Sequence, residues 1–192
     1  MQKIQINLRI ALDGTIIDFE TTHWDINLGE LITAGFLSDE GIVIYQRINS
    51  TEEEFKKILT SEIRNRKRPW CAFNKGFEEK FLQISIDNDL QQHERESAFG
   101  ALLNENLLDH YSALDDPCFN DEIKSFWYAY RATKDLVFLS KIIRHNYCCL
   151  VKEYYLNLRR EKGFDPSEIT PFPSSAKIEK KFIRKQLGIF KE

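Results

Sequence analysis

The segment Thr15–Thr22 constrains this chain more than any other. It reads Thr-Ile-Ile-Asp-Phe-Glu-Thr-Thr and is rich in β-branched residues, which favours a β-strand. Residues two apart in a strand point to the same face, so Asp18 and Glu20 should project together. Two carboxylates on a core strand need compensation for their charge, and a divalent cation that prefers oxygen ligands, Mg²⁺ or Mn²⁺, would provide it. The alternative is an edge strand with both acids in water.

Two later segments add to this pattern. Residues 70–82 place Asn74 ahead of an aromatic–acid pair, Phe77-Glu78, at the start of a predicted helix. Residues 128–146 lead into another predicted helix and close with His145-Asn146. With the first strand, these segments resemble, in order, the motifs of the DEDD 3′–5′ exonucleases, which have a ribonuclease H-like fold. They are most similar to the predicted RNase H-like nucleases related to the exonuclease domain of DNA polymerase B.

The resemblance covers roughly residues 11–158 and implies a metal-dependent 3′–5′ exonuclease, a phosphodiester hydrolase that acts on a single-stranded nucleic-acid end. The implied cofactor is Mg²⁺ or Mn²⁺. The residues it implies as metal ligands are Asp18, Glu20 and Glu78. The residues it implies for catalysis are Asp18, Glu20, Glu78 and His145. The residues it implies for contact with nucleic acid are Thr21, Thr22 and Asn74.

The chain departs from the family pattern at two positions. The second motif normally carries Asp, where this chain has Glu78, and the closing Asp is missing because Cys149 stands at its position. Glu153 lies one helical turn further on and could supply a fourth carboxylate. The departures keep a second function open: a catalytically degenerate ribonuclease H-like domain that serves as a nucleic-acid- or protein-binding module.

Individual residues also keep plainer interpretations. Glu78 could be an exposed helical acid paired with Lys75, and His145 could be a helix-packing histidine. Thr21 and Thr22 could simply end the strand. Asp109 follows an apolar pair at the end of a predicted strand. The related nucleases also have an acid at this place, so Asp109 is expected near the site without being a ligand.

Composition narrows the class of protein. The chain has 192 residues, 42% of them hydrophobic, which suits one domain with a sizeable core. The formal net charge is −3, so a nucleic-acid binder of this kind must concentrate its basic residues in a patch. We see neither a run of eighteen apolar residues nor a signal peptide, so no membrane association is expected. The four cysteines include no Cys-x-x-Cys pair, which favours reduced thiols and a cytoplasmic location.

The expected fold is α/β, with a central mixed five-stranded sheet whose first three strands are antiparallel and whose faces are covered by helices. The strands are expected at 15–21, 29–37, 42–48, 69–74 and 107–109. Residues 3–12 alternate between apolar and polar, which predicts either a further strand or an N-terminal extension. Helices are expected after the capping box at Ser50–Glu54 and over 77–86, 121–130 and 135–158, the last with Asp135 as N-cap. We expect an exonuclease-type domain over 1–158. A basic extension over 159–192, a linker followed by an amphipathic helix, should pack on it.

Overall fold

The computed structural model describes residues 1–90, 114–118, 122–162, 172–186 and 188, with only the backbone described at 159–162. The strands in this part of the chain are β1 (Gln2–Asn7), β2 (Thr15–Thr21), β3 (Leu31–Ser38), β4 (Gly41–Gln46), β5 (Trp70–Ala72) and β6 (Asn88–Asp89). The helices are α1 (Glu52–Arg64), α2 (Lys75–Leu82), α5 (Glu122–Thr133), α6 (Leu136–Lys162) and α7 (Ser175–Gln186).

The strands form one mixed sheet in the order β1-β4-β3-β2-β5-β6. Neighbours are antiparallel from β1 to β2, whereas β2, β5 and β6 run parallel. The expected number of five strands was wrong, since the described residues alone hold six. β1 pairs with β4 at the edge of the sheet, and the two-residue β6 was not predicted. The expected strand at 107–109 lies outside the described residues.

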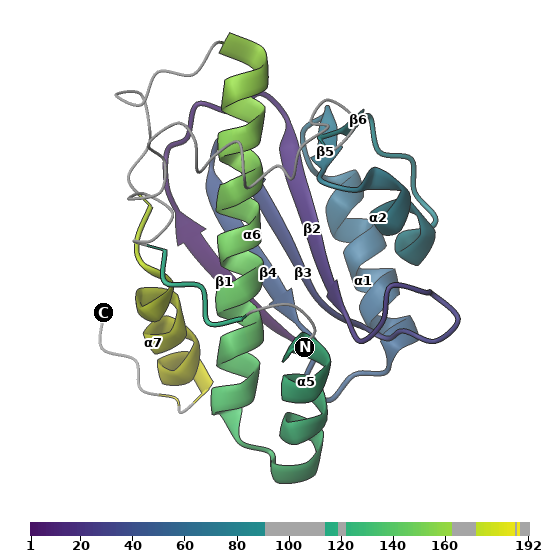
Figure 1. Cartoon of the computed structure of the whole chain (residues 1–192), viewed down its shortest axis with the longest axis vertical. Helices are drawn as coiled ribbons and strands as arrows, with labels where there is room; N and C mark the ends of the chain where they lie inside the picture. Colours follow the sequence, from purple (N-terminus) through teal and green to yellow (C-terminus); the bar gives the residue numbers. More distant parts are fainter. Residues whose placement is uncertain (91–113, 119–121, 163–171, 187, 189–192) are drawn as a thin grey trace.

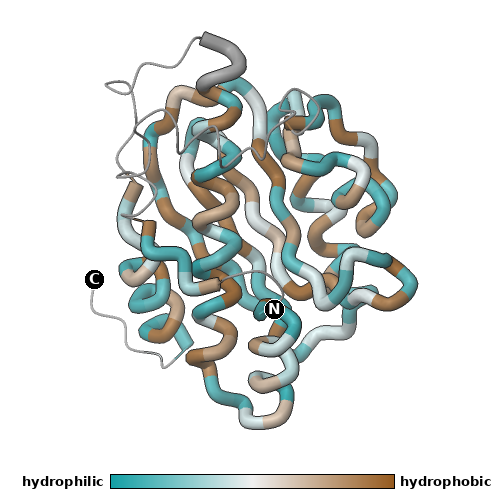
Figure 2. Tube along the Cα trace, viewed as in Figure 1, coloured by the Kyte–Doolittle hydropathy of each residue, from teal (hydrophilic) through white to brown (hydrophobic). Residues whose placement is uncertain are grey.

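Helices cover both faces of the sheet (Figure 1). On one face α6 crosses β2, β3 and β4, with α5 and α7 packed beside it. On the other face α1 and α2 pack on the sheet. Figure 2 shows hydrophobic residues following the strands that lie between these two layers. The sheet therefore separates two hydrophobic cores, and β2 lies inside it, away from both edges, as the sequence predicts.

Local signals set the helix starts. Thr51 accepts a hydrogen bond from the backbone N–H of Glu54, whose side chain accepts one from the Thr51 N–H, so the predicted capping box is confirmed. Asp135 Oδ1 accepts a hydrogen bond from the backbone N–H of Val137 at 2.9 Å, as an N-cap does. These caps explain why the starts of α1 and α6 could be predicted within a residue or two.

The C-terminal helix α7 contributes to the core beside α6. Ile178 and Phe182 are buried in the same cluster as the inner side chains of α6, and Glu179 forms an ion pair with Arg144 of α6. The helix α6 itself continues to Lys162, beyond the boundary expected at residue 158. Within the described residues, no helix is both long enough and apolar enough to cross a membrane.

Candidate metal and catalytic site

Strand β2 carries the first two acidic residues of the site. Ile17 and Phe19 point into the core beneath α1 and α2, whereas Ile16 belongs to the core on the α6 side. Alternation along the strand therefore turns Asp18 and Glu20 together toward α6, and the predicted shared face is confirmed. A register shift between Glu20 and Thr21 interrupts the pairing with β3 at this point. Such irregularities re-aim the residues that follow and are frequent beside functional sites.

Helix α6 approaches β2 closely at Asp18. Asn146 Nδ2 donates to Asp18 Oδ2 at 2.7 Å and to the Asp18 carbonyl oxygen at 3.1 Å. Gly35 on β3 pairs directly with Asp18 and leaves the space that this approach needs. A Cβ at position 35 would lie 2.2 Å from Asn146 Oδ1 and 2.6 Å from Leu150 Cδ1. The glycine thus lets α6 hold the Asp18 carboxylate in one orientation.

Two further carboxylates are buried near Asp18. Glu78 on α2 is 3% exposed and Glu153 on α6 is also 3% exposed, so the alternative interpretation of Glu78 as an exposed helical acid is wrong. The Oε2 atom of each has no hydrogen-bond partner among the described residues. Burial raises the pKa of both groups well above the ordinary value, and the charge of Asp18 raises it further in each case. These two acids and the β2 pair form what we call the carboxylate cluster: Asp18, Glu20, Glu78 and Glu153.

Burial favours the protonated form of the acids in the carboxylate cluster. Burial raises the pKa of Asp18 to about 6, although nearby His145 opposes the rise. Burial, with a contribution from the Asp18 charge, raises the pKa of Glu20 to about 8. Mutual repulsion prevents all four groups from ionising together unless positive charge enters the cluster.

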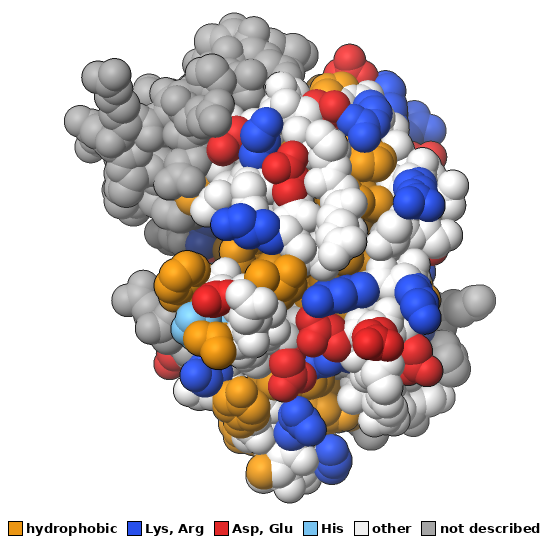
Figure 3. Space-filling model, turned by 90° about the vertical axis from the view of Figure 1, so that its right-hand side faces the viewer, with side chains coloured by type: hydrophobic (Ala, Val, Ile, Leu, Met, Phe, Trp, Pro, Cys, Tyr) orange, Lys and Arg blue, Asp and Glu red, His pale blue; other side chains and the backbone are white. Residues whose placement is uncertain are grey.

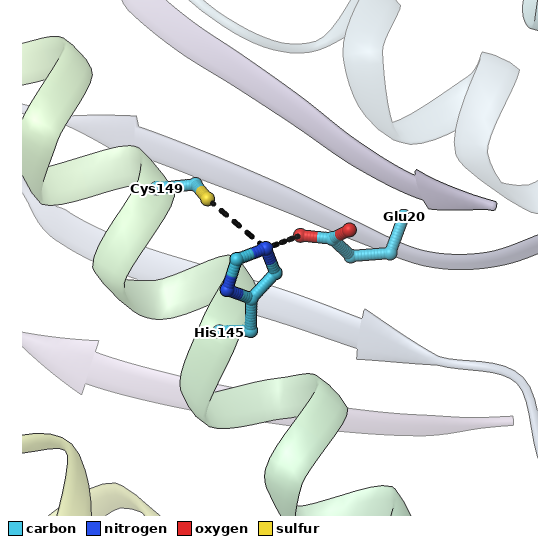
Figure 4. Close-up of side chains that lie close together, drawn as sticks. All are labelled: Glu20, His145 and Cys149. Atoms are coloured by element: carbon cyan, nitrogen blue, oxygen red, sulfur yellow. Dashed lines mark hydrogen bonds and ion pairs between the residues drawn. The ribbon is translucent and has the colours of Figure 1, made fainter. Parts of the chain in front are cut away.

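His145 lies beside the carboxylate cluster and is oriented by a second carboxylate. Its Nδ1 is 2.9 Å from Asp116 Oδ1, while its Nε2 lies 3.9 Å from Glu20 Oε1 and 3.6 Å from Cys149 Sγ. Figure 4 shows the imidazole, carboxylate and thiol turned toward one another from α6 and β2. The predicted closeness of His145 to the acids of β2 is confirmed.

Lys152 binds the carboxylate that orients His145. Its Nζ is 2.7 Å from Asp116 Oδ2, so Asp116 joins the lysine and the imidazole. Burial alone would lower the pKa of His145, but Glu20 and Asp116 outweigh it and raise the pKa to about 10. Although burial opposes it, hydrogen bonding and charge from His145 and Lys152 lower the pKa of Asp116. Sequence reasoning missed Asp116 and Lys152, although a lysine in the middle of an apolar helix signals a buried partner.

A pocket of about 600 Å³ opens beside Glu20 and His145. Its walls include Thr21 and Thr22, together with Trp24, Phe77 and Lys124. The Trp24 side chain is 77% exposed, which is unusual for so large an apolar group. A planar ligand entering the pocket would meet aromatic side chains and one lysine next to the carboxylate cluster.

The two threonines also have structural roles. Thr22 Oγ1 accepts from the backbone N–H of Glu30 at 2.8 Å, and Thr21 Oγ1 donates to the carbonyl oxygen of His23 at 2.9 Å. Asn74 is exposed at the start of α2, and Asp109 lies outside the described residues. Of the residues expected to touch nucleic acid, only the threonines are seen to line this pocket.

Surface charge does not indicate a nucleic-acid-binding patch on the side of the molecule that carries α1 and α2. On the face that carries α1 and α2, basic and acidic side chains are interspersed with hydrophobic ones (Figure 3). Positive charge is therefore not gathered into one patch on that face. The basic helix α7 lies on the other face of the sheet, where Lys181 and Lys185 donate to backbone carbonyls of β1.

The chemistry of the carboxylate cluster suits a hard cation. Carboxylate oxygens are the ligands that Mg²⁺ and Mn²⁺ prefer, and a cation would neutralise the unpaired buried oxygens of Glu78 and Glu153. No family model, curated protein or solved structure matches this chain. Inference about its chemistry therefore starts from the carboxylate cluster, the oriented histidine and the adjoining pocket.

Proposed function

We propose that this protein is a metal-dependent phosphodiester hydrolase that trims nucleic acid. The observation that carries the proposal is the carboxylate cluster itself. Four buried acids from three elements lie close enough for their charges to act on one another, and two of them keep a buried oxygen without a hydrogen-bond partner among the described residues. Buried charges that lack a partner are costly, and proteins retain them chiefly where a ligand or a reaction uses them.

The residues that would hold Mg²⁺ or Mn²⁺ are Asp18, Glu20, Glu78 and Glu153. Divalent cations bound between such carboxylates supply an activated water and charge stabilisation for phosphoryl chemistry. The chain's own contribution is to present these ligands in fixed positions. Asn146 holds the rotamer of Asp18, and the strand geometry of β2 keeps Glu20 on the same face.

His145 is suited to move a proton at this site. Asp116 accepts from Nδ1 and so leaves Nε2 facing Glu20 and the pocket. A histidine oriented in this way can take a proton from an attacking water and release it later. Its pKa of about 10 reflects the negative charge of its neighbours, so added positive charge would bring it down toward neutrality.

The pocket favours an unpaired nucleotide as substrate. A nucleobase that is not in a duplex can stack on an aromatic side chain such as Trp24 or Phe77. Lys124 is exposed on the pocket wall and can pair with a phosphate. The 3′–5′ direction of attack rests on the resemblance of the three sequence motifs.

The test is a trimming assay on a 5′-labelled single-stranded oligonucleotide with Mn²⁺ or Mg²⁺. We expect a ladder that shortens from the 3′ end, and no products with EDTA. Asp18→Asn and Glu78→Gln should each lower the rate by more than about 100-fold, because they remove direct ligands. Asp13→Asn is the matched control, since that carboxylate is exposed just before β2 and pairs with Lys67.

The alternative is a degenerate binding module, and Cys149 at the position of an acid is the observation that favours it. In that case the wild-type protein would shift an oligonucleotide on a native gel and produce no shortened products with either metal. Cleavage that persists equally in EDTA and in Asp18→Asn would contradict the metal-dependent mechanism.

A further inference from the structure

Cys149 has no evident use in the proposed hydrolase. Its thiol is half-buried between the carboxylate cluster and His145. Sulfur is a poor ligand for Mg²⁺, so the thiol would not complete a hard-cation site. The side chains around it nevertheless form a second, softer set of ligands.

The sulfur and nitrogen of this set have the spacing of two ligands on a tetrahedral ion, and the Glu20 oxygen, now 3.9 Å from Nε2, would have to move about 0.6 Å closer to reach the N···O separation of about 3.3 Å. Ligand atoms of Glu20, His145 and Cys149 all lie within 4.8 Å of one another. The Sγ to Nε2 distance is 3.6 Å and the Oε1 to Nε2 distance is 3.9 Å. A thiolate and an imidazole bound to one tetrahedral zinc are about 3.5 Å apart, given bonds of about 2.3 and 2.1 Å. The sulfur and nitrogen are thus already at the spacing that the ion requires.

The histidine is also prepared as a ligand. Zinc-binding histidines usually donate their other ring N–H to a carboxylate, which fixes the tautomer and aims the free nitrogen at the metal. His145 Nδ1 lies 2.9 Å from Asp116 Oδ1, which accepts its proton in this way, and Lys152 donates to the second oxygen of Asp116. The contact with Asp116 is therefore the outer part of the same arrangement.

A competing set on the other side of the imidazole fits less well. Asp116, Cys118 and His145 also have ligand atoms within 4.8 Å. Asp116 already accepts from His145 Nδ1 at 2.9 Å, however, and Lys152 holds its second oxygen at 2.7 Å, so an ion bound there would have to displace both partners. Cys118 is buried as well, whereas Glu20 and His145 line the open pocket.

We propose that Glu20, His145 and Cys149 form a binding site for Zn²⁺, with the fourth position open toward the pocket. This set has one carboxylate, one imidazole and one thiolate, which favours Zn²⁺ over Mg²⁺. Zinc binds a thiolate and a neutral imidazole, so zinc binding releases the protons that the thiol and the imidazole carry without metal.

Sharing of Glu20 gives this site a regulatory consequence, which rests on the proposed hydrolase function. Zinc on Glu20 would withdraw a ligand from the carboxylate cluster and occupy the space next to His145. Micromolar Zn²⁺ should then inhibit cleavage in the presence of millimolar Mg²⁺, and Cys149→Ser should relieve the inhibition.

The direct test uses Co²⁺ and Zn²⁺ alone, with no nucleic acid. Co²⁺ bound by a thiolate gives a charge-transfer absorption band in the near ultraviolet, and added Zn²⁺ should abolish it. Cys149→Ser should lose the band and lower Zn²⁺ affinity by more than about 10-fold. Cys118→Ser is the matched control and should keep both. Asp116→Asn should keep the band but weaken affinity by about 10- to 100-fold, as loss of an outer partner does.

The outcomes are distinct from those of the nuclease assay. A band that survives in Cys149→Ser and disappears in Cys118→Ser would overturn the assignment in favour of the competing set. The absence of a cobalt–thiolate band in the wild-type protein would overturn it altogether. If the Cys149→Ser protein does not fold, Cys149→Ala is the second variant. If the wild-type protein shows the cobalt–thiolate band but cleaves no nucleic acid with Mg²⁺ or Mn²⁺, the proposed function is refuted and the zinc site is still supported.

Discussion

Helix α6 presents three different chemical groups in a row toward β2. Cys149 follows His145 by four residues, and Glu153 follows Cys149 by four, so each lies about one helical turn from the next on the same face. The middle group is a thiol, and the carboxylate comes one turn later. Glu153 is 3% exposed and belongs to the carboxylate cluster.

This arrangement makes Glu153 essential to the proposed hydrolase. We expect Glu153→Gln to lower the Mn²⁺-dependent rate by more than about 100-fold, because it removes a ligand. The same change should stabilise the metal-free protein, since it removes a buried acid whose ionisation the fold opposes. A trimming assay and a thermal melt without metal measure the two effects. Glu53→Gln, an exposed acid on α1, should change neither, and full activity of Glu153→Gln would contradict this role.

Single residues could be predicted where periodicity governs them. The shared face of Asp18 and Glu20 follows from the alternation of a strand, and the common face of His145 and Cys149 follows from helical spacing. Asp116 could not be found in this way. It lies in a segment without periodicity, and its contact with His145 joins positions 29 residues apart, which only the folded chain brings together.

Among the elements, the crossing of α6 over β3 depends on one missing side chain. Gly35→Ala should place a Cβ against Asn146 and Leu150, force α6 away and release Asp18 from its hydrogen bond. We expect a loss of about 1–3 kcal/mol in the free energy of unfolding, the usual range for overpacking, together with reduced activity. Urea denaturation measures the first effect and the trimming assay the second.

The control for that substitution is another glycine. A Cβ on Gly76 of α2 would meet only Asn74 Oδ1, at 3.8 Å, so Gly76→Ala has room. Because alanine favours a helix over glycine by about 1 kcal/mol, this variant should be as stable as the wild type or slightly more stable. Equal stability of the Gly35→Ala and Gly76→Ala proteins would show that the close approach of α6 is not required.

Elements with strong local signals were predicted well, and those defined by distant pairing were not. Thr51 and Asp135 mark helix starts in the sequence because their side chains bond to nearby backbone groups. The alternation in β1 indicates a strand with one buried face but does not specify that β4 is its partner. The strand β6 has only two residues, Asn88 and Asp89, and no periodicity can reveal it.

At the scale of the whole molecule, α7 ties the C-terminal part of the chain to the core. Phe182 is fully buried in the cluster that contains α6. Phe182→Ala should therefore lower the free energy of unfolding by about 3–5 kcal/mol, as large-to-small core changes do. Lys180→Ala on the exposed face of the same helix should stay within about 0.5 kcal/mol of the wild type in urea denaturation. Equal effects of the two would mean that α7 is not part of the cooperative unit.

The carboxylate cluster should also make the stability of the whole fold depend on pH and on metal. A group whose pKa is raised on folding stabilises the folded protein below its unfolded pKa and loses this contribution as pH rises through the folded value. On folding, the pKa of Glu20 rises from 4.5 to about 8 and that of His145 from 6.5 to about 10. The contribution of each group to folding stability therefore declines as pH rises. The pKa of Asp18 rises to about 6, so its contribution to folding stability also declines with rising pH, over a lower pH range.

We therefore expect the metal-free protein to lose stability, on the order of a few kcal/mol, as pH rises from about 5 to 9. Mn²⁺ should raise the melting temperature more at about pH 8 than at about pH 5, because protons compete with the metal for the same carboxylates. Glu153→Gln should flatten the pH dependence and reduce the gain from Mn²⁺. Melting curves across this range test the idea, and a metal-free protein that becomes steadily more stable toward pH 9 would contradict it, because the buried acids would then have to be ionised and compensated without a cation.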